Sequence, residues 1–136
     1  GALSLERLAG IAREAGGEGH HFRFIQLPLN LAMPEAFGMQ VDGENVLGLA
    51  GRLGITAVAS ASLLQARLAR NLPSEIRDRL LGTRTDAQRA IQYVRSTPGI
   101  TAALVGMSSR EHVRENLELA TVAAATEEQY LGLFEN

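Results

Sequence analysis

Apolar residues along the chain follow two spacings, one typical of helices and the other of buried strands. Residues 4–15 carry apolar positions at i, i+3, i+4 and i+7, which predict an amphipathic helix ended by the Gly-Gly pair that follows. Runs rich in apolar residues at 22–27, 55–60 and 100–105 predict short strands. Because these runs do not alternate polar with apolar residues, we expect both faces of each strand to be covered.

Helices are predicted between and after these strands. A long loop over 30–45 leads into a helix over 44–53, which Gly54 closes. Residues 61–84 are less regular, and a short helix is expected after Pro73.

Pairs of residues that cap helix N-termini mark the later helices. Thr85 with Gln88, and Thr126 with Gln129, have the spacing of a capping box. The first pair begins a helix that runs to Ser96, and the second begins a short helix in the tail 121–136.

The predicted order α-β-α-β-α-β-α-α is typical of parallel strands joined by helical crossovers, that is, of the α/β class. No linker divides residues 1–136, so we expect a single domain. A complete (β/α)8 barrel needs roughly 250 residues. The sequence therefore predicts either a small three-stranded α/β layer or the closing part of a barrel whose first strands lie elsewhere.

Composition narrows the possible partners and chemistry. A formal net charge of −2 gives no reason to expect binding to nucleic acid or to an anionic membrane. No apolar run reaches the roughly 18 residues of a membrane span, and we expect a cytoplasmic protein. The 13 basic residues are all arginine, so this chain supplies no lysine for a Schiff base or for tuning a neighbouring tyrosine. His20 and His21 are adjacent and point to opposite faces of an extended chain, so no metal site is expected.

The segment 97–117 holds the clearest chemical signal. Its apolar strand runs into Gly106, and Ser108 with Glu111 has capping-box spacing for a new helix. Free N–H groups and the positive dipole end of such a helix favour an anion. The sequence therefore predicts an anion site at this strand-to-helix turn.

From about Leu3 to Ala120 the chain resembles the C-terminal half of an aldo-keto reductase. The resemblance rests on three segments in the same order: Phe24–Leu31, then Gly54–Gln65, then Val105-Gly106 with His112 and Glu115-Asn116-Leu117. It implies a partial TIM (β/α)8 barrel made of the last three strand–helix units plus a C-terminal tail helix.

The resemblance also implies a cofactor site for NADP(H), with NAD(H) as a possible substitute. Gln26 matches a glutamine that contacts the nicotinamide carboxamide, and Ser60 stands where many members carry a stacking aromatic ring. The remaining implied positions contact the pyrophosphate, the adenosine phosphate and the adenine: Ser62, Leu63, Gln65, Gly106, Met107, Ser108, His112, Glu115 and Asn116. Among the scattered arginines, Arg67 is the candidate for a phosphate contact, and Ala66-Arg67 replaces a common glycine of the family.

The family's catalytic Asp, Tyr, Lys and His lie in the half of the barrel that this chain lacks. Neither Tyr93 nor Tyr130 has a lysine partner, so both are expected to pack in the core or at the surface. We therefore expect an oxidoreductase portion that is inactive alone and belongs to an enzyme reducing aldehydes or ketones. The alternatives are a non-catalytic nucleotide-binding or regulatory module, and a structural chain paired with a second copy of itself instead of the missing N-terminal half.

Overall fold

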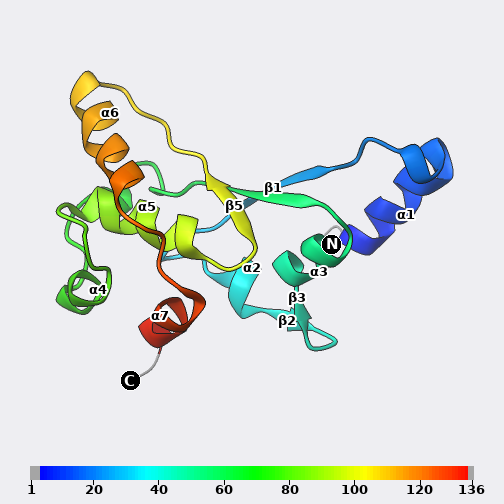
Figure 1. Ribbon diagram of the computed structural model, residues 1–136, viewed down its shortest axis with the longest axis horizontal. Helices are drawn as coiled ribbons and strands as arrows, with labels where there is room; N and C mark the ends of the chain where they lie inside the picture. Colours follow the sequence, from blue (N-terminus) through cyan, green and yellow to red (C-terminus); the bar gives the residue numbers. More distant parts are fainter. Residues whose placement is uncertain (1–3, 135–136) are drawn as a thin grey trace.

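Three parallel strands form the centre of the structure, a computed structural model that describes residues 4–134. The strands are β1 (Phe24–Pro28), β4 (Thr56–Ser60) and β5 (Ile100–Ala103), and they lie side by side in the order β1-β4-β5 (Figure 1). Sequence order and spatial order agree, as the predicted α/β crossovers require. A register shift between Ala57 and Val58 interrupts the pairing of β4 with β5.

The helices join and flank these strands. The longer ones are α1 (Leu5–Gly16), α3 (Val46–Arg52), α5 (Asp86–Ser96) and α6 (Arg110–Leu117). The shorter ones are α2 (Glu35–Gly38), α4 (Ser74–Arg79) and α7 (Glu127–Leu131), with 3-10 turns η1 (Gly17–Gly19), η2 (Arg67–Ala69), η3 (Glu118–Thr121) and η4 (Gly132–Phe134).

Most helix ends follow the sequence signals. Side chains of Ser4, Thr85 and Thr126 accept the capping hydrogen bonds of α1, α5 and α7, and Gly54 takes the left-handed φ of +67° expected after α3. Two expectations were incomplete. The loop over 30–45 contains α2 and a small hairpin of β2 (Gln40–Val41) and β3 (Glu44–Asn45), and the helix of the tail is shorter than 121–136.

The sheet is covered on one face only. Ala57 and Ala59 of β4 are buried against the helices, whereas Thr56, Val58 and Ser60 on the opposite face are partly exposed. Phe24 of β1 is 67% exposed. In Figure 1, α2, α3 and α5 lie together on one side of the strands. The expectation that both faces are covered is therefore wrong for this chain by itself.

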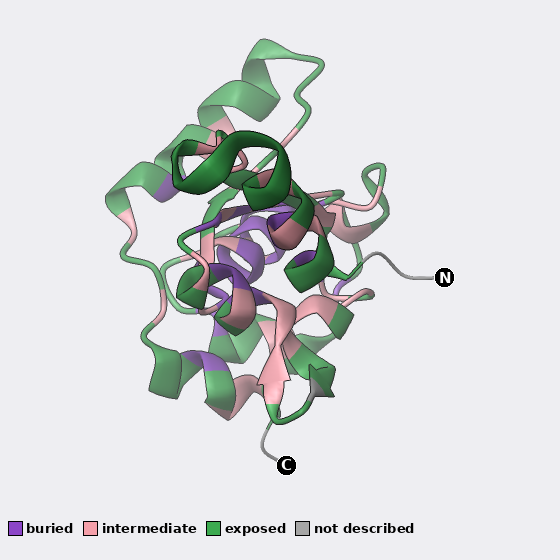
Figure 2. Cartoon of the chain, turned by 90° about the vertical axis from the view of Figure 1, so that its right-hand side faces the viewer, coloured by how far each residue is buried: buried purple, intermediate pink, exposed green. Residues whose placement is uncertain are grey.

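The covered face carries the core, which lies at the centre of the molecule (Figure 2). The larger cluster joins Leu29, Ala59, Leu80, Tyr93, Val94 and Tyr130, and a smaller one joins Leu5, Ala9, Ala50 and Ile55. Burial raises the pKa of Tyr130 and Tyr93 above the usual range for tyrosine, which fits their place in the core.

A row of polar side chains on α5 holds the tail against the molecule. The Gln92 amide donates to the carbonyl of Ala123 at 2.8 Å, and the Arg95 guanidinium donates to the carbonyl of Val122. The hydroxyl of Ser96 accepts from the N–H of Ala125 at 2.9 Å. These three bonds place residues 122–125 along α5 and bring α7 to the core.

Candidate functional site

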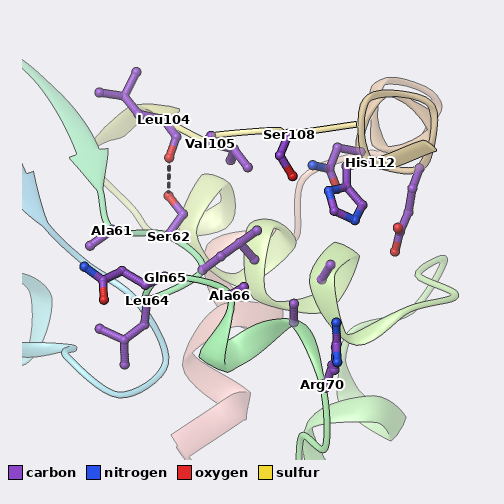
Figure 3. Close-up of a pocket in the computed structure, with 16 residues that line it drawn as sticks. Ala61, Ser62, Leu64, Gln65, Ala66, Arg70, Leu104, Val105, Ser108 and His112 are labelled. Atoms are coloured by element: carbon purple, nitrogen blue, oxygen red, sulfur yellow. Dashed lines mark hydrogen bonds between the residues drawn. The ribbon is translucent and has the colours of Figure 1, made fainter. Parts of the chain in front are cut away.

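The carboxyl ends of β4 and β5 meet at one edge of the sheet, because the two strands are parallel neighbours. The Ser62 hydroxyl, which follows β4, donates to the carbonyl of Leu104, which follows β5, at 3.0 Å (Figure 3). Ser62 is only 1% exposed, so this bond fixes the two loops to each other away from solvent.

A pocket of about 380 Å³ lies at this edge (Figure 3). Its walls come from the loop after β4, the loop after β5, α5 and α6. Eight of the residues expected to bind cofactor line it: Ser62, Leu63, Gln65, Gly106, Ser108, His112, Glu115 and Asn116. The rest of the lining is Ala61, Leu64, Ala66, Ala69, Arg70, Ala87, Leu104 and Val105.

Three expected residues lie outside this pocket. Gln26 is exposed on β1, and Ser60, two strand positions from Val58, lies on the same open face of the sheet. Met107 is 44% exposed and does not line the pocket. The structure therefore brings together the expected phosphate and adenine positions except Met107, and separates them from the expected nicotinamide positions.

The loop after β4 has an unusual backbone. Ala61, Leu64, Gln65 and Ala66 all have φ between +45° and +65°, a region in which a side chain costs roughly 1–2 kcal/mol per residue. Such strain persists only where the surrounding structure imposes it, and it gathers at functional sites. This loop gave no periodic signal in the sequence, which is why Leu64 and Ala66 were missed as pocket residues.

The buried side chain of Asn30, just after β1, helps to hold this loop. Its amide nitrogen donates to the carbonyl of Ala61 at 3.0 Å, and its amide oxygen accepts from the N–H of Ala32 at 2.9 Å. Asn30 is fully buried, so both bonds are shielded from water. The loops after all three strands are thus linked, by Asn30 on one side and by Ser62 on the other.

Two backbone donors of the strained loop are free. Within residues 4–134, the N–H groups of Gln65 and Ala66 donate to no protein acceptor, whereas the N–H of Leu64 bonds to the carbonyl of Ala61 at 2.8 Å. Unsatisfied N–H groups in the wall of a pocket are suited to an anionic ligand.

Helix α6 begins one residue later than its sequence signal indicated. The side chain of Ser109, not that of Ser108, accepts from the N–H of His112 at 3.2 Å and caps the helix. The expected capping box of Ser108 with Glu111 is therefore wrong. Because Ser109 is the cap, Ser108 is left free to line the pocket.

The basic side chains of the pocket come from opposite walls. His112 projects from α6, and Arg70 lies across from it (Figure 3). Arg67, the arginine singled out in the sequence, does not line the pocket. The arginine that lines it is Arg70, which follows the single turn η2. Arg70 was missed because the irregular segment 61–73 gives no face on which to place it.

Two side chains at the start of α5 donate hydrogen bonds to Glu115. The Thr85 hydroxyl donates to Oε1 of Glu115, and the Gln88 amide donates to the backbone carbonyl of Glu115 at 2.7 Å. Within the part of the chain that the structure describes, Oε2 of Glu115 and the side-chain amide of Asn116 have no hydrogen-bond partner. The wall formed by α6 thus presents a carboxylate oxygen and an amide to the pocket.

The ion pair of Arg84 with Glu118 leads to a prediction about how stability depends on pH. The Arg84 guanidinium and the Gln88 amide both donate to the Glu118 carboxylate, and these contacts lower the pKa of that carboxyl. The stabilisation is present above the unfolded pKa of about 4.3 and is lost as the pH falls through the lower folded value. We expect the free energy of unfolding to fall less steeply below pH 5 in Glu118→Gln than in the wild type, measured by urea denaturation.

Because Glu118 is exposed, that difference should shrink in 1 M salt. Glu111→Gln removes the same charge from the neighbouring α6 and is the control. Parallel pH profiles for the wild type and Glu118→Gln would contradict the prediction.

The described residues show two further absences. No group of three or more His, Asp or Glu side chains within residues 4–134 could hold a metal ion. In the same range no helix is long and apolar enough to cross a membrane.

Comparisons with known proteins were made by sequence and by structure. No protein-family model matches the sequence, and no curated protein matches it. The fold is similar to the holo form of an aldo-keto reductase from Bacillus halodurans, with a TM-score of 0.60 and 18% identity over 85% of this chain and 43% of that one. The apo form gives a TM-score of 0.59 and 18% identity over 85% and 44%.

A thermostable aldo-keto reductase in complex with the inhibitor epalrestat gives a TM-score of 0.62 and 21% identity, over 93% of this chain and 43% of that one. The chain therefore spans less than half the length of the structures it matches. Its strand order and helical crossovers agree with that likeness. The chain has the fold of part of an aldo-keto reductase, an incomplete TIM (β/α)8 barrel.

Proposed function

We propose that the chain is the cofactor-binding C-terminal portion of an aldo-keto reductase, and that it binds NADP(H). The observation that carries this proposal is the pocket at the carboxyl ends of β4 and β5. It gathers residues from the second and third matching segments, which are about 40 positions apart in the sequence. Ligands of (β/α)8 barrels bind at this end of the strands.

The pocket suits the adenosine end of a dinucleotide. Its volume of about 380 Å³ is at the small end of ligand pockets and fits one nucleotide half. The free N–H groups of Gln65 and Ala66 suit a phosphate, and the α6 wall with Glu115 and Asn116 suits the amino edge of a base.

The nicotinamide end would lie on the open face of the sheet, near Gln26 and Ser60. When bound, the cofactor supplies a hydride for the reduction of an aldehyde or ketone. In this proposal the exposed amide of Gln26 would orient the ring, and this chain supplies no lysine for a proton-transfer set. Turnover therefore requires residues from outside this chain.

The partner that completes the enzyme is the remaining part of the barrel. The uncovered face of β1 and β4 is the face that points into the barrel interior in a closed (β/α)8 fold, since the opposite face packs on the helices. Phe24 on this face is exposed here and would be covered by the other strands.

A second candidate function is a nucleotide-binding module without catalysis. The observation that favours it is that eight of the expected phosphate and adenine positions already line one pocket within this chain. Binding would then need no further strands, whereas reduction would.

A fluorescence titration of NADPH tests the binding site. We expect saturable binding to the wild-type chain, weakened about tenfold or more in Glu115→Ala/Asn116→Ala, because two hydrogen-bonding groups of the α6 wall are lost. Glu111→Ala removes the same charge from α6 outside the pocket and should bind as the wild type does.

The same samples, mixed with NADPH and a reactive aldehyde, should show no oxidation of the cofactor. Measurable turnover would overturn the assignment of the catalytic set to another part of the barrel. Absence of binding in a folded sample would overturn the proposal that the pocket forms without the remaining strands.

A further inference from the structure

Helix α6 contributes three of the side chains that line the pocket, but none of its own residues is buried within the described chain. Its apolar side chains, Val113 and Leu117, are 36% and 63% exposed. Residues 105–109, which join it to β5, have no regular secondary structure, and Figure 1 shows α6 at the far end of this segment. A helix without a packed apolar face needs other contacts to fix its position.

The side chain of Gln88 on α5 supplies such contacts. Its amide nitrogen donates to the backbone carbonyl of Glu115 at 2.7 Å and to the carboxylate of Glu118, just after α6, at 2.8 Å. Its amide oxygen accepts from the backbone N–H of Arg84 at 2.8 Å. Gln88 is only 2% exposed, and both of its N–H donors and its oxygen are engaged. A buried amide with all its partners in place holds them in one arrangement.

Glu115 is the point at which α6 is attached. Within residues 4–134, both hydrogen bonds that join α6 to another element end at this residue, one from Gln88 and one from the hydroxyl of Thr85. The next anchor along the chain is Leu119, which lies beyond the helix and is 4% exposed. Gln88 does not line the pocket, so it acts on a ligand only through Glu115.

We propose that Gln88 is the positioning residue of the α6 wall and thereby determines whether the pocket distinguishes adenine from hypoxanthine. This inference rests on the proposed function. A carboxylate oxygen of Glu115 accepts from the amino group of adenine, whereas hypoxanthine presents a carbonyl oxygen at the same ring position. Discrimination requires the carboxylate to lie at hydrogen-bond distance from the base, and that distance depends on where Gln88 holds the backbone of Glu115.

Gln92 offers a matched control on the same helix. It lies one turn after Gln88 and is 3% exposed, and its amide donates to the carbonyl of Ala123 in the tail at 2.8 Å. In the described chain it forms no hydrogen bond with α6. Methionine in place of either glutamine keeps an unbranched side chain of similar length and removes a buried amide. Both variants should lose stability, but only Gln88→Met should alter the pocket.

The test is a fluorescence titration of NADPH and of its hypoxanthine analogue, deamino-NADPH. The wild type should prefer NADPH about five- to tenfold, the value of one hydrogen bond. Gln88→Met should reduce this preference to within twofold, and Gln92→Met should keep the wild-type ratio. The ratio of the two affinities is the readout, because a general loss of folded protein weakens both ligands alike.

A shorter amide provides a second pair of variants. If Gln88→Met does not fold, Gln88→Asn gives the same comparison with Gln92→Asn, because removal of one methylene withdraws the amide from its partners. An unchanged ratio in the Gln88 variant, or an equal loss of preference in the Gln92 variant, would overturn the inference.

Hydrogen exchange of the ligand-free chain separates this inference from the proposed function. Gln88→Met should speed exchange of the α6 amides about tenfold, and Gln92→Met should leave them within twofold of the wild type. If this occurs while neither dinucleotide binds the wild type, Gln88 positions α6 but the dinucleotide function fails. If the α6 amides exchange equally fast in the wild type and in Gln88→Met, the positioning role is refuted.

Discussion

Tyr130→Ala should lower the free energy of unfolding by about 3–5 kcal/mol, the usual cost of deleting a large buried aromatic side chain. Tyr130 is fully buried in the larger core cluster, and its ring centroid lies 5.2 Å from those of Phe37 and Tyr93. Its hydroxyl also accepts from the Thr97 hydroxyl at 2.9 Å. Urea denaturation followed by circular dichroism measures the loss.

Tyr130→Phe is the matched control, because it keeps the ring and removes only the hydroxyl. It should cost about 1 kcal/mol, since Thr97 retains the carbonyl of Tyr93 as an acceptor at 3.1 Å. A loss below 1 kcal/mol in Tyr130→Ala would mean that the tail does not belong to the core.

Gly99→Ala should cost about 2–5 kcal/mol for two additive reasons. Gly99 has φ +88°, where a side chain is strained by roughly 1–2 kcal/mol. A Cβ there would also lie 2.8 Å from Cβ of the buried Leu47 on α3, so the core would have to shift, at roughly 1–3 kcal/mol. The variant should show a lower denaturation midpoint with an unchanged m-value.

Gly51→Ala, a substitution within helix α3 itself, should raise the free energy of unfolding, whereas Gly99→Ala lowers it. A Cβ at Gly51 meets no atom within 4 Å, and alanine favours the helix by roughly 0.5–1 kcal/mol. If Gly99→Ala were as stable as Gly51→Ala, the close packing of α3 against the turn before β5 would be refuted.

Local signals in the sequence were sufficient for most of the helices and for the strand order. The hydroxyl side chains of Ser4, Thr85 and Thr126 each stand directly before an apolar stripe, and each caps the helix that follows. Ser108 and Ser109 are adjacent and chemically identical, so spacing alone cannot decide between them. In the structure Ser109 accepts the capping hydrogen bond from the N–H of His112.

Tertiary context accounts for the remaining differences. Apolar runs predict burial, but they do not reveal whether the covering strands belong to the same chain, and Phe24 is exposed for that reason. Arg70 reaches the pocket through a turn built on left-handed residues that are not glycine. Propensity disfavours that conformation, so no reading of the sequence would have placed Arg70 there.

The polar row of Gln92, Arg95 and Ser96 recognises the tail through its backbone carbonyl and N–H groups rather than its side chains. The three hydrogen bonds therefore depend on the backbone of residues 122–125, and of these residues Val122 also places its side chain close to Gly82. The chain can therefore be divided just before residue 122, to give a shortened chain and a separate tail peptide. A separate peptide with the tail sequence should complement the shortened chain, with its extended segment lying along α5 and Tyr130 anchoring it in the core.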